Sequence, residues 1–414
     1  MSTEQKKVSN RGSHQYSPEE VRRILLEKIE EERSLNFDGK DSSSDILQDI
    51  NYDKNKANVL SLFCGAGGLD FGLEIAGIES VLKKDILNTV NNEEQYKKLR
   101  HLSIFNHMYA NDLFDEAIET YKINFPDCQV IQNKDIRKVK DFPKADLVLG
   151  GFPCPGFSEA GPRLIDDPRN FLYLHFIRCL LQSKPKFFIA ENVKGMMTLG
   201  KGEVFKQIVQ DFEAAGYKVY HKLLNSRDFG VPQIRERVFL VGVRHDIDFK
   251  YEFPTPSHGE KEGQKPYVTL EDAIKDLESC PGEYFQGSYS SMYMSRNRKK
   301  RWDEQSFTIQ ASGRQAPLHP GGAPMKKINS NKWEFVDESK ERRLSISEIR
   351  RIQTFPDWWK FNDGINNKKI SDNGRIDKVY KQIGNAVPSY MARAVIKPIA
   401  DWFVLNINGE RYDS

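Results

Sequence analysis

Apolar and polar positions follow two alternating patterns between residues 59 and 244. Short apolar runs typical of buried strands, such as VLSLF, ADLVLGG, KFFIAENV and RVFLVGV, are separated by stretches with helical spacing, such as NFLYLHFIRCLLQ and EVFKQIVQDFEAAG. Strands that alternate with helices are typical of parallel sheets covered by helices on both faces. The pattern therefore predicts an α/β fold with a doubly wound, mostly parallel sheet.

The pattern changes at three points and so divides the chain. A polar start precedes the α/β region, and from about residue 246 Gly, Pro, Ser and aromatic residues replace the regular periods, as expected of a loop-rich domain. Helical spacing returns at RRLSISEIRRIQTFP and in YKQIGNAVPSYMARAVIKPIADWF. The predicted units are an N-terminal extension at 1–57, the α/β domain at 58–245, a second, smaller domain at 246–341, and a return segment at 342–414 that completes the α/β domain.

Two shorter segments stand out from this plan. In the polar extension, Ser17, Pro18 and regularly spaced apolar residues predict one helix over residues 17–33. A polar stretch rich in Lys and Asn, residues 83–107, resembles an insertion on a loop, and we expect no chemistry from it.

Composition narrows the class of protein. The 414 residues are long enough for two to three domains by the prior of about 150 residues per domain. No apolar run reaches the roughly 20 residues that a membrane helix needs, and the polar N-terminus lacks the core of a signal peptide, so we expect a cytoplasmic protein without a membrane partner. The five cysteines form no CxxC pair, which argues against a disulfide framework and a metal site.

Charge is unevenly distributed along the chain. The net charge is +3, but residues 281–330 alone hold eight Lys and Arg residues against three acidic residues. Such a stretch suits phosphate binding, although basic runs are more often solvated surface.

The first candidate site is the glycine-rich turn between the run VLSLF and the following helical segment. Glycines allow a ligand close to the backbone, and a helix N-terminus favours polar or anionic groups. The turn matches neither GxGxxG nor GxxxxGK[ST], so nicotinamide and nucleoside triphosphate sites gain no support. Asp112 and Asp135 follow probable strands, where carboxylates can accept hydrogen bonds from ribose or an adenine amine. A plain tight turn and solvated surface carboxylates remain the alternatives.

The second candidate is Cys154, which lies between Pro153 and Pro155 at the end of the run ADLVLGG. Active sites of open α/β sheets lie at the carboxyl ends of the strands. The two prolines stiffen the loop and prevent the strand from continuing, which favours a displayed thiol. A small buried residue is the alternative, and no histidine spacing indicates a Cys-His pair.

Two further candidates flank later strands. Glu191 ends an apolar run, where desolvation would favour its protonated form, although a helix-capping Glu-Asn pair explains it equally well. Arg235 and Arg237 are two residues apart before a strand and so share a face. Surface ion pairs are the usual explanation for such arginines, but paired guanidinium groups also recognise phosphates and base edges.

These segments, in this order, resemble the C5-cytosine DNA methyltransferase family. Its characteristic blocks correspond here to LFCGAGG, GFPCPGFS, ENVKG, QIRER, RRLSISEIRRIQTFP and QIGNAVP, spread over residues 59–403. Six ordered blocks make the resemblance specific. It implies a Rossmann-like, S-adenosylmethionine-dependent catalytic domain at 58–245 and a DNA-recognising domain at 246–341.

The resemblance also implies roles for the candidate residues. Cys154 is expected to add to C6 of a cytosine flipped out of the duplex, so that C5 can accept the methyl group. Glu191 is expected at N3, Arg237 at O2 and Arg235 at a phosphate, and no step needs a metal. Cofactor contacts are expected from Phe63, Gly65, Ala66, Gly68, Asp112 (ribose), Asp135 (adenine), Ile136, Pro153, Leu172, Asn385, Ala386 and Val387. The family's ribose carboxylate is usually a Glu followed by an aromatic residue, whereas Leu113 follows Asp112 here.

DNA contacts are implied in two places. Ser158 and Arg169, in the loop after Cys154, are expected to bind phosphate. Residues 287–320 resemble the recognition segment of bacterial methyltransferases that modify GGCC, so Arg296, Arg298 and Arg314 are expected to bind guanine edges. Lys299, Lys300 and Arg301 are expected at phosphates or in solvent.

The function predicted from the sequence is therefore a site-specific DNA (cytosine-5)-methyltransferase. Its expected partner is double-stranded DNA, and we expect a monomer that belongs to a restriction-modification system, with a cognate endonuclease acting on the same site without direct contact. Two alternatives are an RNA (tRNA) cytosine-5 methyltransferase on the same scaffold and a DNA-binding module that has lost turnover.

Overall fold

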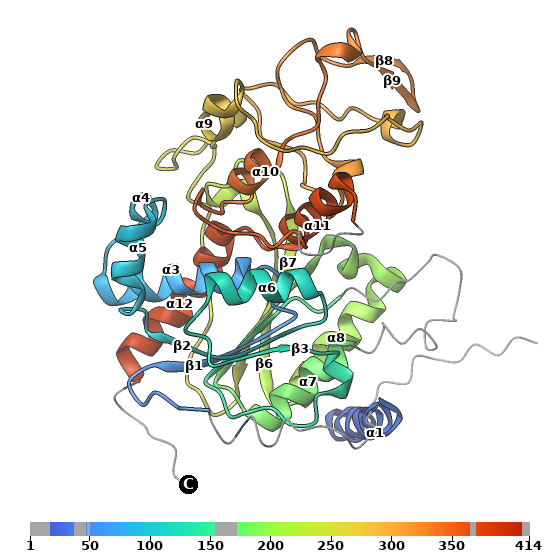
Figure 1. Cartoon of the computed structure of the whole chain (residues 1–414). Helices are drawn as coiled ribbons and strands as arrows, with labels where there is room; N and C mark the ends of the chain where they lie inside the picture. The colour runs from blue at the N-terminus through green and yellow to red at the C-terminus, as the bar shows by residue number, and fades with distance from the viewer. Residues whose placement is uncertain (1–16, 37–46, 48–49, 154–171, 365–369, 408–414) are drawn as a thin grey trace, which may run out of the picture.

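A seven-stranded sheet forms the centre of the computed structural model, which describes residues 17–36, 47, 50–153, 172–364 and 370–407 (Figure 1). The strands are β1 (Ala57–Leu62), β2 (Phe105–Asp112), β3 (Val130–Asn133), β4 (Leu147–Gly150), β5 (Phe187–Val193), β6 (Tyr217–Asn225) and β7 (Glu236–Arg244). Their order is β3-β2-β1-β4-β5-β7-β6. All neighbours from β3 to β5 pair in parallel, and β7 runs antiparallel to β5 and β6. The predicted mostly parallel sheet is confirmed.

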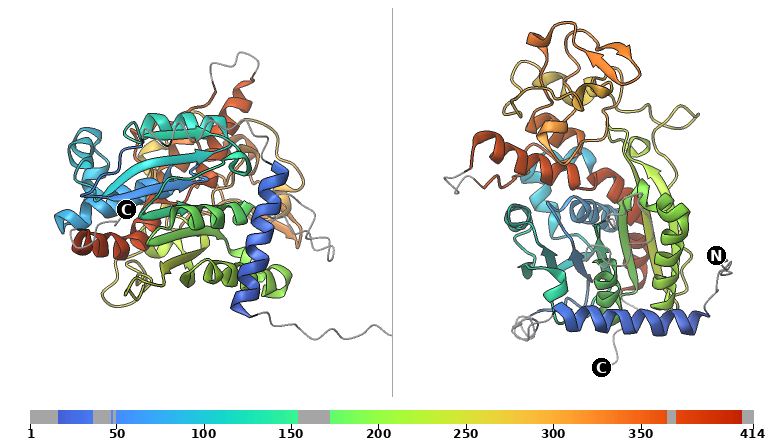
Figure 2. Two further views of the ribbon diagram at one scale, coloured as in Figure 1. Left: turned by 90° about the horizontal axis from the view of Figure 1, so that it is seen from below. Right: turned by 90° about the vertical axis from the view of Figure 1, so that its right-hand side faces the viewer.

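Helices cover both faces of this sheet because alternate strand residues point to opposite sides. Val148 and Phe188 join the apolar core beneath α7 (Leu172–Ser183) and α8 (Glu203–Ala214). Leu149 and Ile189, each one position further, join the core beneath α3 (Gly68–Leu82) and α12 (Ser389–Asn406). Helix α6 (Asp115–Asn124) shares an aromatic core with α3. Figure 2 shows this layered arrangement from two further directions.

The helix predicted in the N-terminal extension is confirmed as α1 (Pro18–Asn36). It lies across the base of α7 and α8 (Figures 1 and 2). Leu25 and Ile29 enter the core of that face, and Arg22 Nη1 donates a hydrogen bond to Ala214 O at 2.7 Å. Part of the extension is therefore packed against the α/β domain.

The segment expected as a loop insertion at 83–107 is instead structured. It forms α4 (Leu87–Val90) and α5 (Glu93–Arg100), and its last three residues begin β2. The buried Tyr96 ring stacks on Trp358 with centroids 5.4 Å apart, and Arg100 forms a 2.7 Å ion pair with the buried Glu74 of α3. The loop prediction was wrong because sparse apolar residues, each at an inward position, anchor these short helices.

The second domain is rich in loops, as predicted. Its regular elements include α9 (Leu270–Ile274), the hairpin β8 (Lys326–Asn329) and β9 (Lys332–Glu334), and then α10 (Ile346–Ile352) and α11 (Asp372–Asn385). In the described part of the chain, the 3-10 helices are η1 (Ile136–Lys138), η4 (Lys194–Gly202), η5 (Ser226–Phe229), η6 (Lys275–Leu277), η7 (Tyr293–Ser295), η8 (Gly313–Gln315) and η9 (Glu338–Lys340).

The boundary expected at residue 342 differs from the packing. Ile349 of α10 and Tyr380 of α11 share one apolar core with Leu270, Phe285 and Ile309 of the second domain. Phe355 and Trp359, between α10 and α11, join the aromatic core of α3 and α6, and α12 joins the core on the same side of the sheet as α3. The described part of the return segment is therefore divided: α10 and α11 pack with the second domain, whereas Phe355, Trp359 and α12 pack with the α/β domain.

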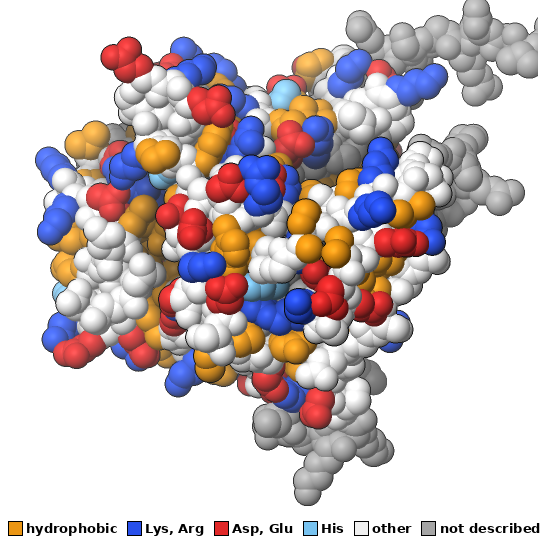
Figure 3. Space-filling view, turned by 90° about the horizontal axis from the view of Figure 1, so that it is seen from above, with side chains coloured by type: hydrophobic (Ala, Val, Ile, Leu, Met, Phe, Trp, Pro, Cys, Tyr) orange, Lys and Arg blue, Asp and Glu red, His pale blue; other side chains and the backbone are white. Residues whose placement is uncertain are grey.

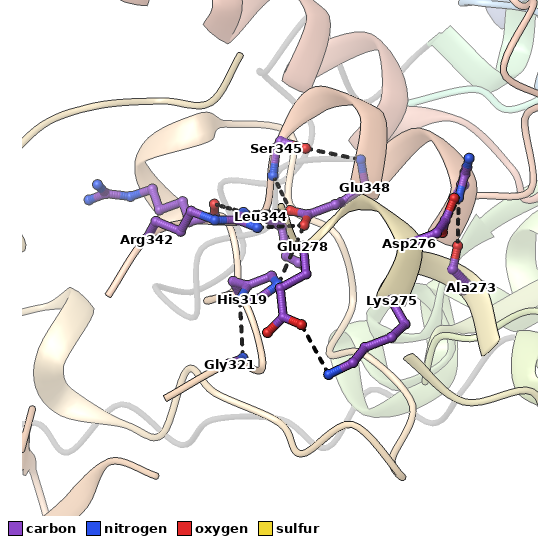
Figure 4. A network of polar contacts seen from close by, with 12 residues as sticks. Ala273, Lys275, Asp276, Glu278, His319, Gly321, Arg342, Leu344, Ser345 and Glu348 are labelled. Carbon is purple, nitrogen blue, oxygen red and sulfur yellow. Dashed lines mark hydrogen bonds and ion pairs between the residues drawn. The ribbon is translucent and has the colours of Figure 1, made fainter. Parts of the chain in front are cut away.

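A polar network fastens α10 to the second domain (Figure 4). Ser345 and Glu348 cap the helix reciprocally, and Arg342 donates two hydrogen bonds of 2.7 Å to the buried Glu348 carboxylate. His319 Nε2 lies 3.6 Å from Glu348 Oε1, and burial lowers the pKa of His319 to about 4. The imidazole is therefore neutral near pH 7.

Across the described parts of the chain, we find no helix with the length and apolar character needed to span a bilayer.

Candidate active site

A cavity of about 530 Å³ opens where the parallel strands β1, β2, β4 and β5 end. Its walls come from the glycine-rich turn after β1, the ends of β2 and β5, the segment 134–137, and residues 381–387 from the end of α11 and the turn after it. Cavities at this edge of an open α/β sheet are where such folds bind their ligands. The cavity therefore brings together segments that are far apart in the sequence.

The glycine-rich turn has the backbone conformation that its residues predict. Gly65 and Gly67 have φ of 54° and 81°, in the left-handed region, and a Cβ on Gly65 would meet no atom within 4 Å. A Cβ on Gly68 would lie 2.3 Å from Val387 O. Glycine at position 68 thus lets the C-terminal segment close the cavity wall against α3, while Gly65 leaves its backbone open to a ligand.

Most of the expected cofactor residues line this cavity. Those lining it are Phe63, Gly65, Gly68, Asp112, Asp135, Ile136, Pro153, Leu172, Asn385, Ala386 and Val387. Ala66 does not line it, because its side chain is buried beneath the turn with 1% exposure. The expectation for Ala66 is therefore corrected to a packing role.

Asp112, at the end of β2, is held by two backbone amides. Its carboxylate accepts hydrogen bonds from Gly65 N at 2.9 Å and Phe114 N at 2.8 Å. Burial raises the pKa of Asp112, although these amides counteract the effect. The exposed Leu113 supplies no aromatic face, but Phe114 lines the cavity and carries Lys381 Nζ at 4.0 Å from its ring centre. An aromatic ring is thus present one position later than the family pattern expects.

Asp135 caps η1 and is bound by a neighbouring cation. Its carboxylate accepts hydrogen bonds from Arg137 Nε, with both distances 3.0 Å. Burial opposes ionisation of Asp135, but the hydrogen bonds and charge of Arg137 prevail and lower its pKa. The carboxylate is ionised near pH 7, so it can accept a further hydrogen bond from a ligand amine.

Glu191 and Arg237 form the polar pair at the other end of the cavity. They project from adjacent antiparallel strands, and Arg237 Nε lies 3.0 Å from Glu191 Oε1. Burial raises the pKa of Glu191 and outweighs the opposing charges of Arg237 and Arg235. The carboxyl can therefore carry a proton at a higher pH than an exposed glutamate.

Asn192, next to Glu191, fixes the backbone that leads to the predicted nucleophile Cys154. Asn192 Nδ2 donates a hydrogen bond to Phe152 O at 2.9 Å, and both side chains are buried. Pro153, the next residue, lines the cavity. Cys154, Ser158 and Arg169 lie outside the described residues.

Arg235 does not occupy the place expected for a phosphate contact. Its side chain is 1% exposed, and it donates hydrogen bonds to the carbonyl oxygens of Ile309 at 3.3 Å, Gly384 at 2.9 Å and Ala386 at 3.0 Å. Burial, more than the neighbouring Arg237 charge, lowers the pKa of Arg235 to about 9. The phosphate assignment was wrong because this guanidinium is enclosed by backbone carbonyls.

Several cavity residues were missed from the sequence. Asp70 accepts hydrogen bonds from Ser61 Oγ and Tyr121 Oη, both at 2.9 Å, and burial raises its pKa to about 7. Lys381 and Asn192 also line the cavity. Asn192 is within the quoted block ENVKG, so that resemblance could have indicated it, whereas Lys381 lies one position before QIGNAVP. Asp70 lies two residues after Gly68, in the first turn of α3, and no spacing distinguishes it from an exposed helix residue.

The three arginines expected to bind guanine edges, Arg296, Arg298 and Arg314, differ in their exposure. Arg296 and Arg314 are exposed, and neither has a side-chain hydrogen bond or ion pair to the described part of the chain. Arg298 is buried: its guanidinium donates hydrogen bonds to Tyr293 O at 2.9 Å and Gln315 Oε1 at 3.0 Å and lies 4.6 Å from the Tyr293 ring centre. The guanine contact expected of Arg298 is therefore corrected to a role in packing the second domain.

The neighbouring basic residues are mostly paired. Lys299 is buried in a 2.8 Å ion pair with Glu341, so its expected phosphate or solvent position was wrong. Lys300 pairs with Glu304 at 2.9 Å and the exposed Arg301 with Asp303 at 2.8 Å. Figure 3, which views the second domain from above, shows Lys and Arg interspersed with Asp and Glu. This face is thus not a uniform basic patch.

The fold and the cavity define an α/β protein with a ligand-sized cavity beside a buried carboxyl-guanidinium pair. The family model of the C-5 cytosine-specific DNA methylase matches residues 57–401, and the chain belongs to this family. The enzyme therefore methylates C5 of cytosine in double-stranded DNA.

Relatives support the same family. The chain is 61% identical to Type II methyltransferase M.BspRI of Lysinibacillus sphaericus, over 96% of this chain and 95% of the relative. It is 58% identical to Type II methyltransferase M.BsuRI of Bacillus subtilis, over 96% and 92% respectively.

Solved structures share the fold. One is the S. pombe Dnmt2 methyltransferase, with a TM-score of 0.54 and 17% identity over 85% of this chain and 100% of that chain. Another is the methyltransferase EhMeth of Entamoeba histolytica, with a TM-score of 0.52 and 18% identity over 83% and 99%.

The methyl donor of this family is S-adenosylmethionine, and the cavity fits it. About 530 Å³ is within the usual range for cofactor sites. The half-buried Asp112 carboxylate can accept from ribose hydroxyls, and the backbone around Gly65 is open to a ligand. The acceptor carboxylate and the open backbone of the turn are thus of the kind that a nucleoside cofactor requires.

Proposed function

We propose that this enzyme uses Cys154 to methylate a cytosine that has left the DNA stack. The observation that carries the proposal is the Glu191–Arg237 pair, 3.0 Å apart, in the same cavity as the glycine-rich turn. A base placed against this pair lies next to the cofactor wall. C5 and C6 of a stacked cytosine are not accessible to such a cavity, so the base must be flipped out.

The chemistry assigns one task to each group. The Cys154 thiolate forms a bond to C6, and the ring electrons move to C5, which becomes nucleophilic. Protonated Glu191 donates to N3 and stabilises the charge that develops there, and Arg237 donates to O2. S-adenosylmethionine, when bound, supplies the methyl group to C5. Loss of the C5 proton to a base and elimination of the thiolate from C6 then restore the aromatic ring.

We assign the cofactor contacts to residues that line the cavity. Asp112 accepts from the ribose hydroxyls and Asp135 from the adenine amine, while the backbone of Phe63, Gly65 and Gly68 surrounds the methionine part. The remaining wall is assigned to Ile136, Pro153, Leu172, Asn385, Ala386 and Val387. Lys381 joins this set because it lies over Phe114 at the cavity rim.

We assign site recognition to the exposed Arg296 and Arg314, and phosphate contacts to Ser158 and Arg169. The resemblance of residues 287–320 to GGCC-modifying enzymes supports GGCC as the target. Relatives named Type II methyltransferases support a place in a restriction-modification system, with a cognate endonuclease that acts on the same site. We propose that the enzyme acts as a monomer.

Bisulfite sequencing of DNA from cells expressing the full chain tests the proposal. Wild-type enzyme is expected to leave 5-methylcytosine at one position of GGCC sites, and Cys154→Ser is expected to leave none. A duplex containing 5-fluorocytosine is expected to trap a covalent adduct at Cys154. Methylation confined to tRNA would support the RNA alternative, and undiminished methylation by Cys154→Ser would refute the nucleophile.

A further inference from the structure

Three buried polar side chains join segments that belong to different parts of the enzyme. Gln233, Arg235 and Gln353 are each at most 1% exposed. Gln233 Nε2 donates to Gln353 Oε1 at 2.6 Å, while Gln233 Oε1 accepts from Ile309 N at 2.9 Å. Gln353 Nε2 in turn donates to the carbonyl oxygens of Ile383 at 2.9 Å and Ala386 at 2.6 Å.

Arg235 spans the same segments on its own. Its Nη1 donates to Ile309 O, and its Nη2 donates to both Gly384 O and Ala386 O. Ile309 lies five residues before the exposed Arg314, and Ala386 lines the cofactor cavity. One guanidinium therefore bridges the recognition segment and the cavity wall.

The bridged segments also touch directly. A Cβ on Gly384 would lie 2.4 Å from Gln310 O, so the backbone at 384 fits closely against the recognition segment. Ile234 N donates to Ser306 O at 2.9 Å, and Thr308 Oγ1 donates to Ile234 O at 2.8 Å. Arg237, two residues after Arg235, holds Glu191. Residues 306–310 are thus connected by these contacts to the segments that form both ends of the active site.

We propose that Arg235 is a positioning residue that couples DNA recognition by the second domain to cofactor binding. DNA that orders residues 306–315 fixes the carbonyl of Ile309, and through Arg235 it fixes the wall at 384–387. Cofactor binding against that wall orders the recognition segment in return, because coupling between two binding sites is reciprocal. This proposal builds on the assignments of Arg314 and Ala386 above.

The test compares the affinity for S-adenosylhomocysteine with and without a saturating duplex that contains the methylated site, by calorimetry on the full chain. In the wild type, the duplex is expected to tighten binding at least about fivefold, the lower end of usual coupling. In Arg235→Met and in Arg235→Lys, which keeps the charge but cannot span both segments, the tightening is expected to fall below twofold. The lysine variant keeps the test valid where the methionine variant does not fold.

Arg343 provides the matched control. It is also buried and also donates to backbone carbonyls, those of Gly287 and Ser288, and its partners among the described residues lie within the second domain. Arg343→Met is expected to lower stability while keeping the wild-type tightening. The proposal would be overturned if a folded Arg235 variant showed the same tightening as the wild type, or if the wild type showed none. An equal loss of tightening in Arg343→Met would also overturn it. Bisulfite sequencing with the wild type tests the proposed function separately. If the wild type methylates its site, the outcomes above bear on the coupling and not on the methyltransferase function.

Discussion

Arg237 and Glu191 form an ion pair of 3.0 Å on neighbouring antiparallel strands, yet burial still raises the pKa of the glutamate. Desolvation of the carboxyl thus exceeds the stabilisation that two nearby guanidinium groups give to its charged form. A cytosine that enters beside this pair removes more water and increases the same effect. Glu191 in this pair is therefore suited to protonating a ring nitrogen at a higher pH than an exposed glutamate could.

We expect Glu191→Gln to lower kcat by about 10²- to 10⁴-fold, the usual contribution of a positioned acid. Glutamine keeps the shape and can donate a hydrogen bond, but it cannot carry the acid proton. The wild-type rate is expected to fall as the pH rises through the raised pKa of Glu191, because the active form is the protonated one. Single-turnover methylation across pH measures both effects, and a variant with the wild-type rate and profile would exclude the acid role.

Asp112→Asn is expected to raise the KM for S-adenosylmethionine about 10- to 150-fold, which corresponds to about 1.5–3 kcal/mol for hydrogen bonds to a charged group. The carboxylate accepts from the Gly65 and Phe114 amides and faces the cavity, so its loss loosens the turn as well as the ribose contact. At saturating cofactor, kcat is expected to change less than KM.

Asp115→Asn is the matched control for this substitution. Asp115 lies three residues further on, in the first turn of α6, and is exposed outside the cavity. An equal rise in KM in the two variants would contradict the ribose assignment.

Arg314→Ala is expected to lower discrimination between the target site and a site with one altered guanine by about 1–3 kcal/mol. Its guanidinium is exposed and has no side-chain partner in the described chain, so the unfolding midpoint is expected to stay within experimental error. Arg298→Ala is the contrasting variant, because it removes the hydrogen bonds to Tyr293 and Gln315 and is expected to lower the midpoint. Methylation rates on matched and altered duplexes measure discrimination, and thermal unfolding measures stability, so together they distinguish the two variants. Unaltered discrimination in Arg314→Ala would exclude a contact between Arg314 and a guanine.

The sheet was predictable wherever a strand is apolar throughout. Runs such as VLSLF and KFFIAENV are buried strands, and their order along the chain determined the doubly wound topology. The first three residues of β2, 105–107, were assigned to a loop because Asn106 and His107 interrupt its apolar pattern. His107 and Asn111 are buried, so polar residues occupy inward positions that a hydrophobicity pattern treats as exposed.

The site was predictable where a residue type is tied to local geometry. Gly65 and Glu191 depend on a turn and on a strand end, and both are visible in the sequence. Arg235, Arg298 and Lys299 were misassigned because their partners are distant or are backbone carbonyls. Glu341, for example, lies 42 positions after Lys299. A basic residue carries no local signal that it is buried.

The packing of the N-terminal helix leads to a prediction about stability. Leu25 of α1 is 3% exposed within the core beneath α7 and α8, whereas the adjacent Leu26 is 43% exposed. Leu25→Ala is expected to lower the free energy of unfolding by about 2–5 kcal/mol, since it removes a buried side chain and leaves a cavity. Leu26→Ala, the same change one position along the helix, is expected to cost less than about 0.5 kcal/mol because the residue is on the surface. Equal midpoints for the two variants in chemical denaturation would mean that α1 does not contribute to the cooperative core.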